Sequence, residues 1–138
     1  MSTTQAQQFY NPPALWDPSV ASFSHVATVP ANSKLIFVAG QGGEEDVKGT
    51  LSNNFRTQVQ YSLNNIRIAL QSQNASMRSI VKLTTLVADH DAEKLTIIVE
   101  EFAKIWTDKK FPANTLIPVP KLAMPGMLVE IEAIAIGK

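Results

Sequence analysis

The spacing of apolar positions along this 138-residue chain predicts two helices. Between Leu51 and Leu70 the apolar residues recur at steps of three or four, which is the period of one helix face. A second segment, 91–106, begins with Asp91 where an N-cap is expected and has acidic residues in its first turn. We therefore expect two amphipathic helices, each with one face against a core.

Five further segments have the composition or the alternation of β-strands. The segment 34–40 is almost continuously apolar and ends at Gly40, a pattern typical of a strand buried on both faces. The short connection Pro30–Ser33 predicts a hairpin between this strand and the preceding one. The predicted strands are 22–29, 34–40, 79–88, 114–119 and 127–136. Their order with the helices predicts an α+β domain in which two helices cover one face of a mixed sheet.

The other face of this sheet has no remaining segment to cover it. Side chains alternate along a strand, so the strand 127–136 has two different faces. One face carries Val129, Ile131, Ala133 and Ala135, and the other carries Leu128, Glu130, Glu132, Ile134 and Ile136. An uncovered apolar sheet face is typical of an oligomer interface. We therefore expect a homo-oligomer with both glutamates at its interface.

Composition narrows the classes of function. The length suits one domain, and the proline-containing residues 1–20 are predicted to be an extended arm whose Trp16 packs onto a domain at 21–138. Twelve basic and twelve acidic side chains cancel, which disfavours a nucleic-acid partner. There is no cysteine, and His25 and His90 lie far apart in the sequence, so we expect no metal site.

The N-terminal segment has neither the basic and apolar regions of a secretory signal nor the arginines of a transit peptide. The apolar runs are much shorter than the roughly 18 residues that would span a bilayer. We therefore expect a cytoplasmic protein with no membrane association.

The two glutamates of the last strand allow two interpretations. A carboxylate in a partly dry interface must be hydrogen-bonded, paired or functional. Like charges at positions i and i+2 repel, which favours protonation of one of them and makes one a candidate general acid or base. Alternatively, both glutamates are rim residues that are solvated or paired with lysines such as Lys121 of a neighbouring chain.

Five motifs, in family-like order and separation, resemble the YjgF/Rid family of reactive-intermediate (enamine/imine) deaminases. They are "LIFVAGQGG", "VQYSLNNIRIAL", "SIVKLTTLVAD", "FPANT" and "LVEIEAIA", and the resemblance covers about residues 22–136. It implies a chorismate-mutase-like α+β fold and a homotrimer with a central β-barrel and small-molecule clefts between subunits. Active members of the family hydrolyse enamines, by way of their imine tautomers, to a 2-keto acid and ammonia without a metal or cofactor.

The resemblance also implies a set of cleft residues. Glu130 matches the first glutamate of the family's "EIEAIA" motif and is the implied catalytic residue. Three residues stand where the family has other side chains: Phe23 for a tyrosine, Val99 for an asparagine and Asn114 for an arginine. The implied substrate-binding residues are Phe23, Ala39, Gly40, Gln41, Val99, Asn114, Thr115 and Leu116.

The departure at Asn114 has the largest chemical consequence. The family's arginine holds the substrate carboxylate, and hydrogen bonds to charged groups contribute about 1.5–3 kcal/mol. Asn114 brings no charge, and only His25 or Lys121 are candidates to replace it. We therefore expect either a divergent imine hydrolase with an altered substrate, or a non-catalytic trimer that binds small molecules or another protein.

Overall fold

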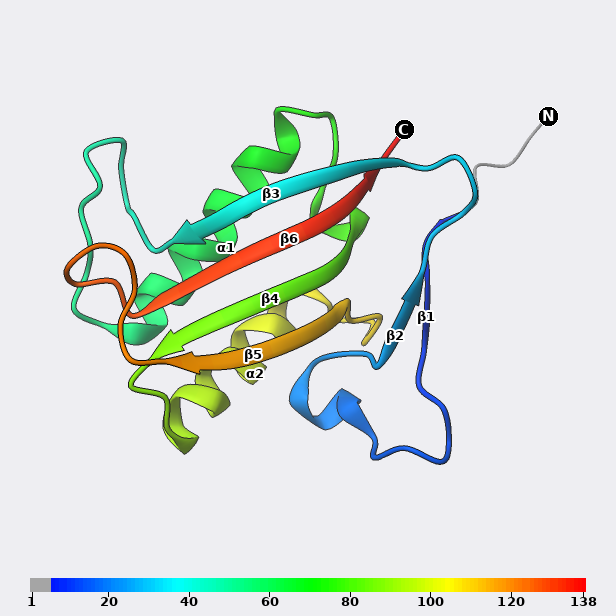
Figure 1. Cartoon of the computed structure of the whole chain (residues 1–138), viewed down its shortest axis with the longest axis horizontal. Coiled ribbons are helices and arrows are strands. Elements are labelled where there is room, and N and C mark those ends of the chain that lie inside the picture. Colours follow the sequence, from blue (N-terminus) through cyan, green and yellow to red (C-terminus); the bar gives the residue numbers. More distant parts are fainter. Residues whose placement is uncertain (1–5) are drawn as a thin grey trace.

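The computed structural model describes residues 6–138. A four-stranded sheet packs against two helices, and a two-stranded ribbon lies beside one end of the sheet (Figure 1). The elements are β1 (Gln8–Tyr10), β2 (Val26–Thr28), β3 (Lys34–Gly42), α1 (Phe55–Gln71), β4 (Ile80–Ala88), α2 (Ala92–Ile105), β5 (Ala113–Val119) and β6 (Val129–Gly137), with one-turn 3-10 helices at Pro18–Ala21 and Met77–Ser79. The predicted α+β class is confirmed.

The strands of the sheet have the order β3-β6-β4-β5. β6 is antiparallel to both β3 and β4, whereas β5 is parallel to β4. A parallel connection needs a long crossover, and α2 supplies it between β4 and β5. The last strand of the chain therefore lies inside a mixed sheet, and β3 and β5 form the edges.

Both helices begin at side-chain caps. Asp91 accepts a hydrogen bond from the Lys94 N–H at 2.8 Å, which confirms the predicted cap of α2. The helix predicted from Leu51 begins later, because the Asn54 side chain accepts from the Thr57 N–H at 2.9 Å and caps α1. No helix among residues 6–138 is long and apolar enough to cross a bilayer.

The predicted hairpin between segments 22–29 and 34–40 is wrong. β2 comprises only Val26–Thr28 and pairs with β1 rather than with β3. The residues before β2 lie at the opposite edge of the sheet, beside β5. There the Ser22 hydroxyl donates to the Val99 carbonyl, and the Ser24 N–H donates to the Pro112 carbonyl. This segment therefore follows the β5 edge and leaves β3 as a free edge.

The N-terminal arm packs less closely than expected. Residues 1–5 of the predicted arm lie outside the described part of the chain. Trp16 was expected to pack onto the domain, but its side chain is 62% exposed and its ring lies 6.4 Å from that of Phe23. The Trp16 carbonyl accepts a hydrogen bond from His25 Nε2 at 2.7 Å, so this loop is held mainly by local contacts.

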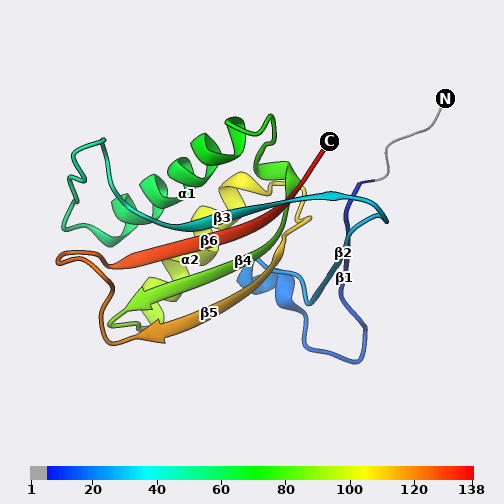
Figure 2. The ribbon, with the colours of Figure 1, turned by 45° about the horizontal axis from the view of Figure 1, so that its top comes forward.

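The two faces of the sheet differ as the alternation in β6 predicts, except at Leu128, which precedes the strand and packs against the core. Toward the helices, Val129, Ile131, Ala133 and Ala135 are at most 2% exposed and belong to the core with Phe102 and Trp106. Figure 2 shows both helices on this side of the sheet. We call the other side the open face, which carries Leu35, Phe37, Lys82, Thr84, Leu86, Thr115, Ile117, Glu130, Glu132, Ile134 and Ile136.

A buried glutamine joins α1 to the loop before it and to the loop before β6. Gln58 is fully buried, and its amide donates to the carbonyls of Ser52 at 2.6 Å and Gly126 at 2.8 Å. Its side-chain oxygen accepts from the Leu128 N–H at 2.9 Å, one residue before β6. The helix pattern predicted a polar outer face, and it did not reveal this inward-pointing amide.

We predict that Gln58→Leu lowers the free energy of unfolding by about 2–3 kcal/mol, because it leaves three backbone groups without their partner. The matched control is Gln71→Leu at the exposed end of α1, which should change stability by less than about 0.5 kcal/mol. Urea denaturation at one fixed chain concentration measures both. A Gln58→Leu variant as stable as the control would contradict the role assigned to this amide.

Candidate functional site

Glu130 lies against the backbone of Gly40. A Cβ atom added at Gly40 would be 2.7 Å from the carboxyl carbon of Glu130, so glycine at this position leaves room for the Glu130 side chain in its present rotamer. The register between β3 and β6 shifts between Val38 and Gln41, at the point where Glu130 crosses. No side chain or backbone group among residues 6–138 forms a hydrogen bond or ion pair with the Glu130 carboxylate. This carboxylate is half-buried and free to bind another molecule.

Polar residues of α1 hold the end of β3 beside this carboxylate. The Ser62 hydroxyl donates to the Gln41 carbonyl at 2.6 Å, and the Asn65 amide donates to the carbonyls of Gly42 and Glu44 at 3.1 and 2.9 Å. The strand therefore continues to Gly42 and does not turn away at Gly40 as its apolar run predicted. Ser62 and Asn65, which point from a helix to a strand end, were not predicted as site residues from the sequence.

The Glu130 carboxylate lines a hollow of about 580 Å³ at this end of the sheet. Four of its lining residues are acidic and none is basic. The lining comprises Gly40, Gln41, Gly42, Glu44, Glu45, Asp46, Val47, Asn64, Asn65, Ile68 and Glu130. The hydroxyl and N–H of Thr50 lower the pKa of Asp46 by hydrogen bonding, so this residue stays ionised. The negative charge of the hollow favours cationic or neutral ligands over anions.

The other predicted cleft residues form a second group at the β5 edge. Asn114 and Leu116 pair with the buried Leu83 and Thr85, so their side chains lie on the helix side of the sheet. The Asn114 side-chain oxygen accepts from the Thr85 hydroxyl at 2.9 Å. Phe23 and Val99 lie at the same edge. Ser24, next to Phe23, forms a β-bridge with Ala113, and the Ser22 hydroxyl donates to the Val99 carbonyl.

The two groups do not meet within one chain. Glu130 projects from the open face beside β3, whereas Asn114 projects from the opposite face of β5, and β4 lies between their strands. The structure therefore brings Ala39, Gly40 and Gln41 to Glu130 but leaves the substrate-binding residues Phe23, Val99, Asn114 and Leu116 at the far edge. A single cleft that contains both groups requires residues from two copies.

Thr115 belongs to neither group. Its hydroxyl lies on the open face and accepts a hydrogen bond from the Lys82 ammonium at 2.8 Å. Burial lowers the pKa of Lys82 below its ordinary value of 10.5, and the charge of Glu132 acts in the opposite direction. Lys82 was not predicted as a site residue from the sequence, although it is the only charged residue of β4 and the alternation of that strand places it on the open face.

Of the two residues considered as replacements for the arginine, neither forms a hydrogen bond with the Asn114 side chain within residues 6–138. His25 is engaged with the Trp16 carbonyl, and Lys121 is an exposed loop residue beyond β5. No three His, Asp or Glu side chains within residues 6–138 come together as a set of metal ligands.

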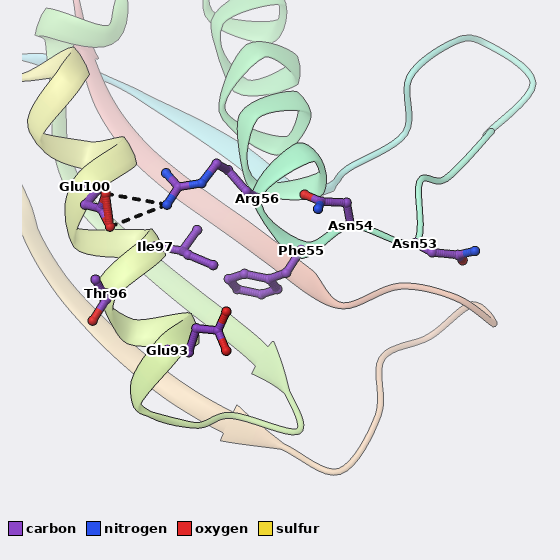
Figure 3. Close-up of a pocket in the computed structure, with 8 residues that line it drawn as sticks. All are labelled: Asn53, Asn54, Phe55, Arg56, Glu93, Thr96, Ile97 and Glu100. Atoms are coloured by element: carbon purple, nitrogen blue, oxygen red, sulfur yellow. Dashed lines mark hydrogen bonds and ion pairs between the residues drawn. The ribbon is translucent and has the colours of Figure 1, made fainter.

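A second hollow, of about 550 Å³, lies between the start of α1 and α2 (Figure 3). Of its polar side chains, Asn54, Arg56, Thr96 and Glu100 already have partners. Asn54 caps α1, and Arg56 contacts Glu100 at 3.4 Å and Glu101 at 2.6 Å. These interactions join the two helices and leave no free basic group to bind a ligand, so this hollow is a weaker candidate than the one beside Glu130.

Glu101 is the buried centre of this helix-to-helix network. Its side chain is only 5% exposed and accepts hydrogen bonds from Lys104, Gln60 and Arg56. Burial opposes its ionisation, but these three donors outweigh burial, so the pKa of Glu101 lies below its ordinary value of 4.5. The ionised carboxylate of Glu101 therefore stabilises the fold fully at pH values above its ordinary pKa of 4.5. This contribution is lost as the pH falls through the lowered pKa of the folded protein.

A family model described as Endoribonuclease L-PSP matches residues 16–137. The RutC family protein of Buchnera aphidicola is 32% identical over 101 residues, which are 72% of this chain and 75% of that protein. Protein HMF1 of Saccharomyces cerevisiae is 29% identical over 119 residues, or 85% of each chain.

The fold also matches solved structures. YyfB of Yersinia pestis, a protein of the conserved Rid family, superimposes with a TM-score of 0.89 at 27% identity, and the match covers 96% of this chain and 99% of that one.

We predict different effects of alanine at two neighbouring glycines. At Gly43 an added Cβ would lie 2.5 Å from the backbone of Gln58, so Gly43→Ala should displace α1 and lower stability by about 1–3 kcal/mol. At Gly40 the nearest atoms all belong to the Glu130 side chain, which can rotate away, so Gly40→Ala should cost less than about 1 kcal/mol.

Urea denaturation and a crystal structure of Gly40→Ala check this pair. The structure should show the Glu130 carboxylate moved from its position over residue 40 while β3 stays in register. Equal destabilisation by the two substitutions would mean that Gly40 is required by the backbone and not by Glu130.

Proposed function

This chain belongs to the Endoribonuclease L-PSP family, also called the YjgF/RutC/Rid family, and we propose that it is a homotrimer whose inter-subunit clefts hydrolyse a small imine. The observation that carries the proposal is the half-buried, unpaired carboxylate of Glu130 above Gly40. A carboxylate without a partner in the described chain is available to activate water.

The open face supports the proposed assembly. Phe37 is 71% exposed and Leu35 is 47% exposed, and both lie on the sheet beside Ile134 and Ile136. Burial of such side chains between copies would remove a contiguous apolar surface from water. Assembly would also allow Glu130 of one copy to approach the Asn114 edge of another.

The proposed chemistry needs one acid–base group. The imine takes up a proton from solvent to become an iminium. Glu130 accepts a proton from water as the water oxygen bonds to the iminium carbon and the C=N electron pair moves to nitrogen, which gives a neutral carbinolamine. Glu130 then gives this proton to the amino group, the C–N bond breaks to release ammonia, and the hydroxyl oxygen forms the C=O bond as its proton passes to the Glu130 carboxylate and back to solvent. The sum is one imine and one water converted to one carbonyl compound and one ammonia, and no redox partner is needed.

The charges favour an imine without a carboxylate. Asn114 contributes an uncharged amide, and the hollow beside Glu130 carries Glu44, Glu45 and Asp46 without a basic residue. An anionic imino acid would be repelled by these groups, whereas a neutral imine or a protonated iminium would not. The apolar side chains of Phe23, Val99 and Leu116 suit a substituent that carries no charge.

Cleavage of RNA, which the name of the matched family model suggests, receives less support from this chain. Binding of a phosphate backbone needs clustered basic side chains. The chain has a formal net charge of zero, and the lining of the hollow beside Glu130 is acidic.

One observation favours a second function, the binding of an apolar small molecule without turnover. The half-buried ring of Phe23 lies between Trp16, at 6.4 Å, and His25, at 5.5 Å, so aromatic surface replaces a hydroxyl-bearing side chain at this edge. Thermal-shift measurements with neutral aromatic metabolites, combined with an assay for ammonia, separate the two functions, because a binding protein is stabilised by a ligand that it does not consume.

We predict that Glu130→Gln lowers kcat/KM for imine hydrolysis by at least about 100-fold, because the amide cannot take up a proton from water. The assay follows ammonia release from an imine generated in situ by oxidation of a primary amine that carries no carboxylate. Glu93→Gln, on α2 at the other side of the sheet, is the matched control and should keep the wild-type rate. A wild-type rate no faster than the uncatalysed rate, or full activity in Glu130→Gln, would refute the proposal.

We predict that Asn114→Arg raises kcat/KM for 2-iminobutyrate by roughly ten- to a hundredfold, because it restores one charge-assisted pair of about 1.5–3 kcal/mol with the substrate carboxylate. Asn114→Gln lengthens the side chain without adding charge and should give no such increase. Circular dichroism confirms that both variants fold. If folded Asn114→Arg shows no gain, this position does not determine carboxylate recognition.

A further inference from the structure

Apart from Glu130, which lies at one end of β6 and pairs with Leu86, the polar side chains of the open face cross its middle. Across β6, β4 and β5, Glu132 pairs with Thr84 and Thr84 pairs with Thr115. The neighbouring row has Lys82 opposite Ile134. We call Lys82, Thr84, Thr115 and Glu132 the polar strip.

Apolar side chains flank the strip on both sides. Phe37 lies beside Ile134 at the end of the sheet where β3 begins, and Leu86 lies beside Ile117 toward the other end. The charges of Lys82 and Glu132 therefore lie between apolar side chains that are suited to burial.

The two charges of the strip interact but are not paired within one chain. The Lys82 ammonium donates to the Thr115 hydroxyl at 2.8 Å, and no ion pair within residues 6–138 includes Lys82 or Glu132. Lys82 is already half-buried, whereas Glu132 is exposed. Covering this face without a partner for each charge would leave them buried and uncompensated, which is strongly unfavourable.

We propose that Lys82 of one copy forms an ion pair with Glu132 of a neighbouring copy, and that this pair sets the register of the assembly. The inference rests on the proposed homotrimer. A second copy is the occupant that the charges favour, because the polar strip of each copy carries one lysine and one glutamate, and symmetric repetition can pair every Lys82 with a Glu132. Apolar neighbours then supply attraction, and the ion pairs select one alignment of the sheets.

The test exchanges the two charges. Lys82→Glu and Glu132→Lys each place like charges opposite one another, and each should raise the dissociation constant of the assembly by at least about 100-fold. The double variant Lys82→Glu with Glu132→Lys should return to within about tenfold of wild type. Lys48→Glu and Glu93→Lys, which reverse charges away from the open face, are the controls and should assemble as wild type does.

Mixing the two single variants distinguishes pairs between copies from pairs within one copy. Opposite charges meet wherever the two variants are neighbours, so the mixture should recover part of the assembly, with at least one like-charged contact left in each ring of three. Pairing within a copy would give no recovery. Analytical ultracentrifugation measures the oligomeric state of each variant and of the mixture, and circular dichroism confirms folding. The neutral substitutions Lys82→Met and Glu132→Gln replace any charge-reversed variant that does not fold.

The outcomes separate this inference from the proposed function. Monomeric wild-type protein would overturn the proposed assembly together with the pairing. A wild-type trimer that Lys82→Glu does not weaken, or a double variant that stays dissociated, would overturn the pairing alone.

Discussion

The uncovered face of the four-stranded sheet is the constraint on which the rest of the molecule depends. Two helices cover one side, and the other side exposes Leu35 and Phe37 at 47% and 71%. Each apolar side chain left in water forgoes about 25 cal/mol for every Å² that could be buried. Assembly would remove this cost, and it would also unite the Glu130 group with the Asn114 edge, which one chain keeps apart.

Close backbone approach connects the fold to the candidate site. Gly40 allows Glu130 to lie across β3, and Gly43 allows the chain directly after β3 to pass close to the backbone of α1 at Gln58. Gln58 in turn anchors the loop that leads into β6, the strand that carries Glu130. The position of the candidate acid therefore depends on core packing on the opposite side of the sheet.

Alternation and helical period predicted what depends on local sequence. The two faces of β6 and the cap at Asp91 follow from neighbouring residues, and both were confirmed. The partner of β2 was not predictable in this way, because the choice between two sheet edges depends on distant contacts such as that of Ser22 with the Val99 carbonyl. The start of α1 was also predicted too early. The apolar spacing continues back to Leu51, but Asn54 caps the helix, which begins at Phe55.

For the candidate site, the resemblance supplied the residues but not their arrangement. Only the register shows that Asn114 and Glu130 project from opposite faces. The grouping of Ser62 and Asn65 with the end of β3 likewise needed the tertiary structure.

Sedimentation equilibrium of the wild-type protein at micromolar concentration shows whether other copies of this chain cover the open face. We expect a single species of about three times the chain mass of 15.1 kDa. A stable monomer of 15.1 kDa would contradict it, because the two groups of the candidate site would then have no means of forming one cleft.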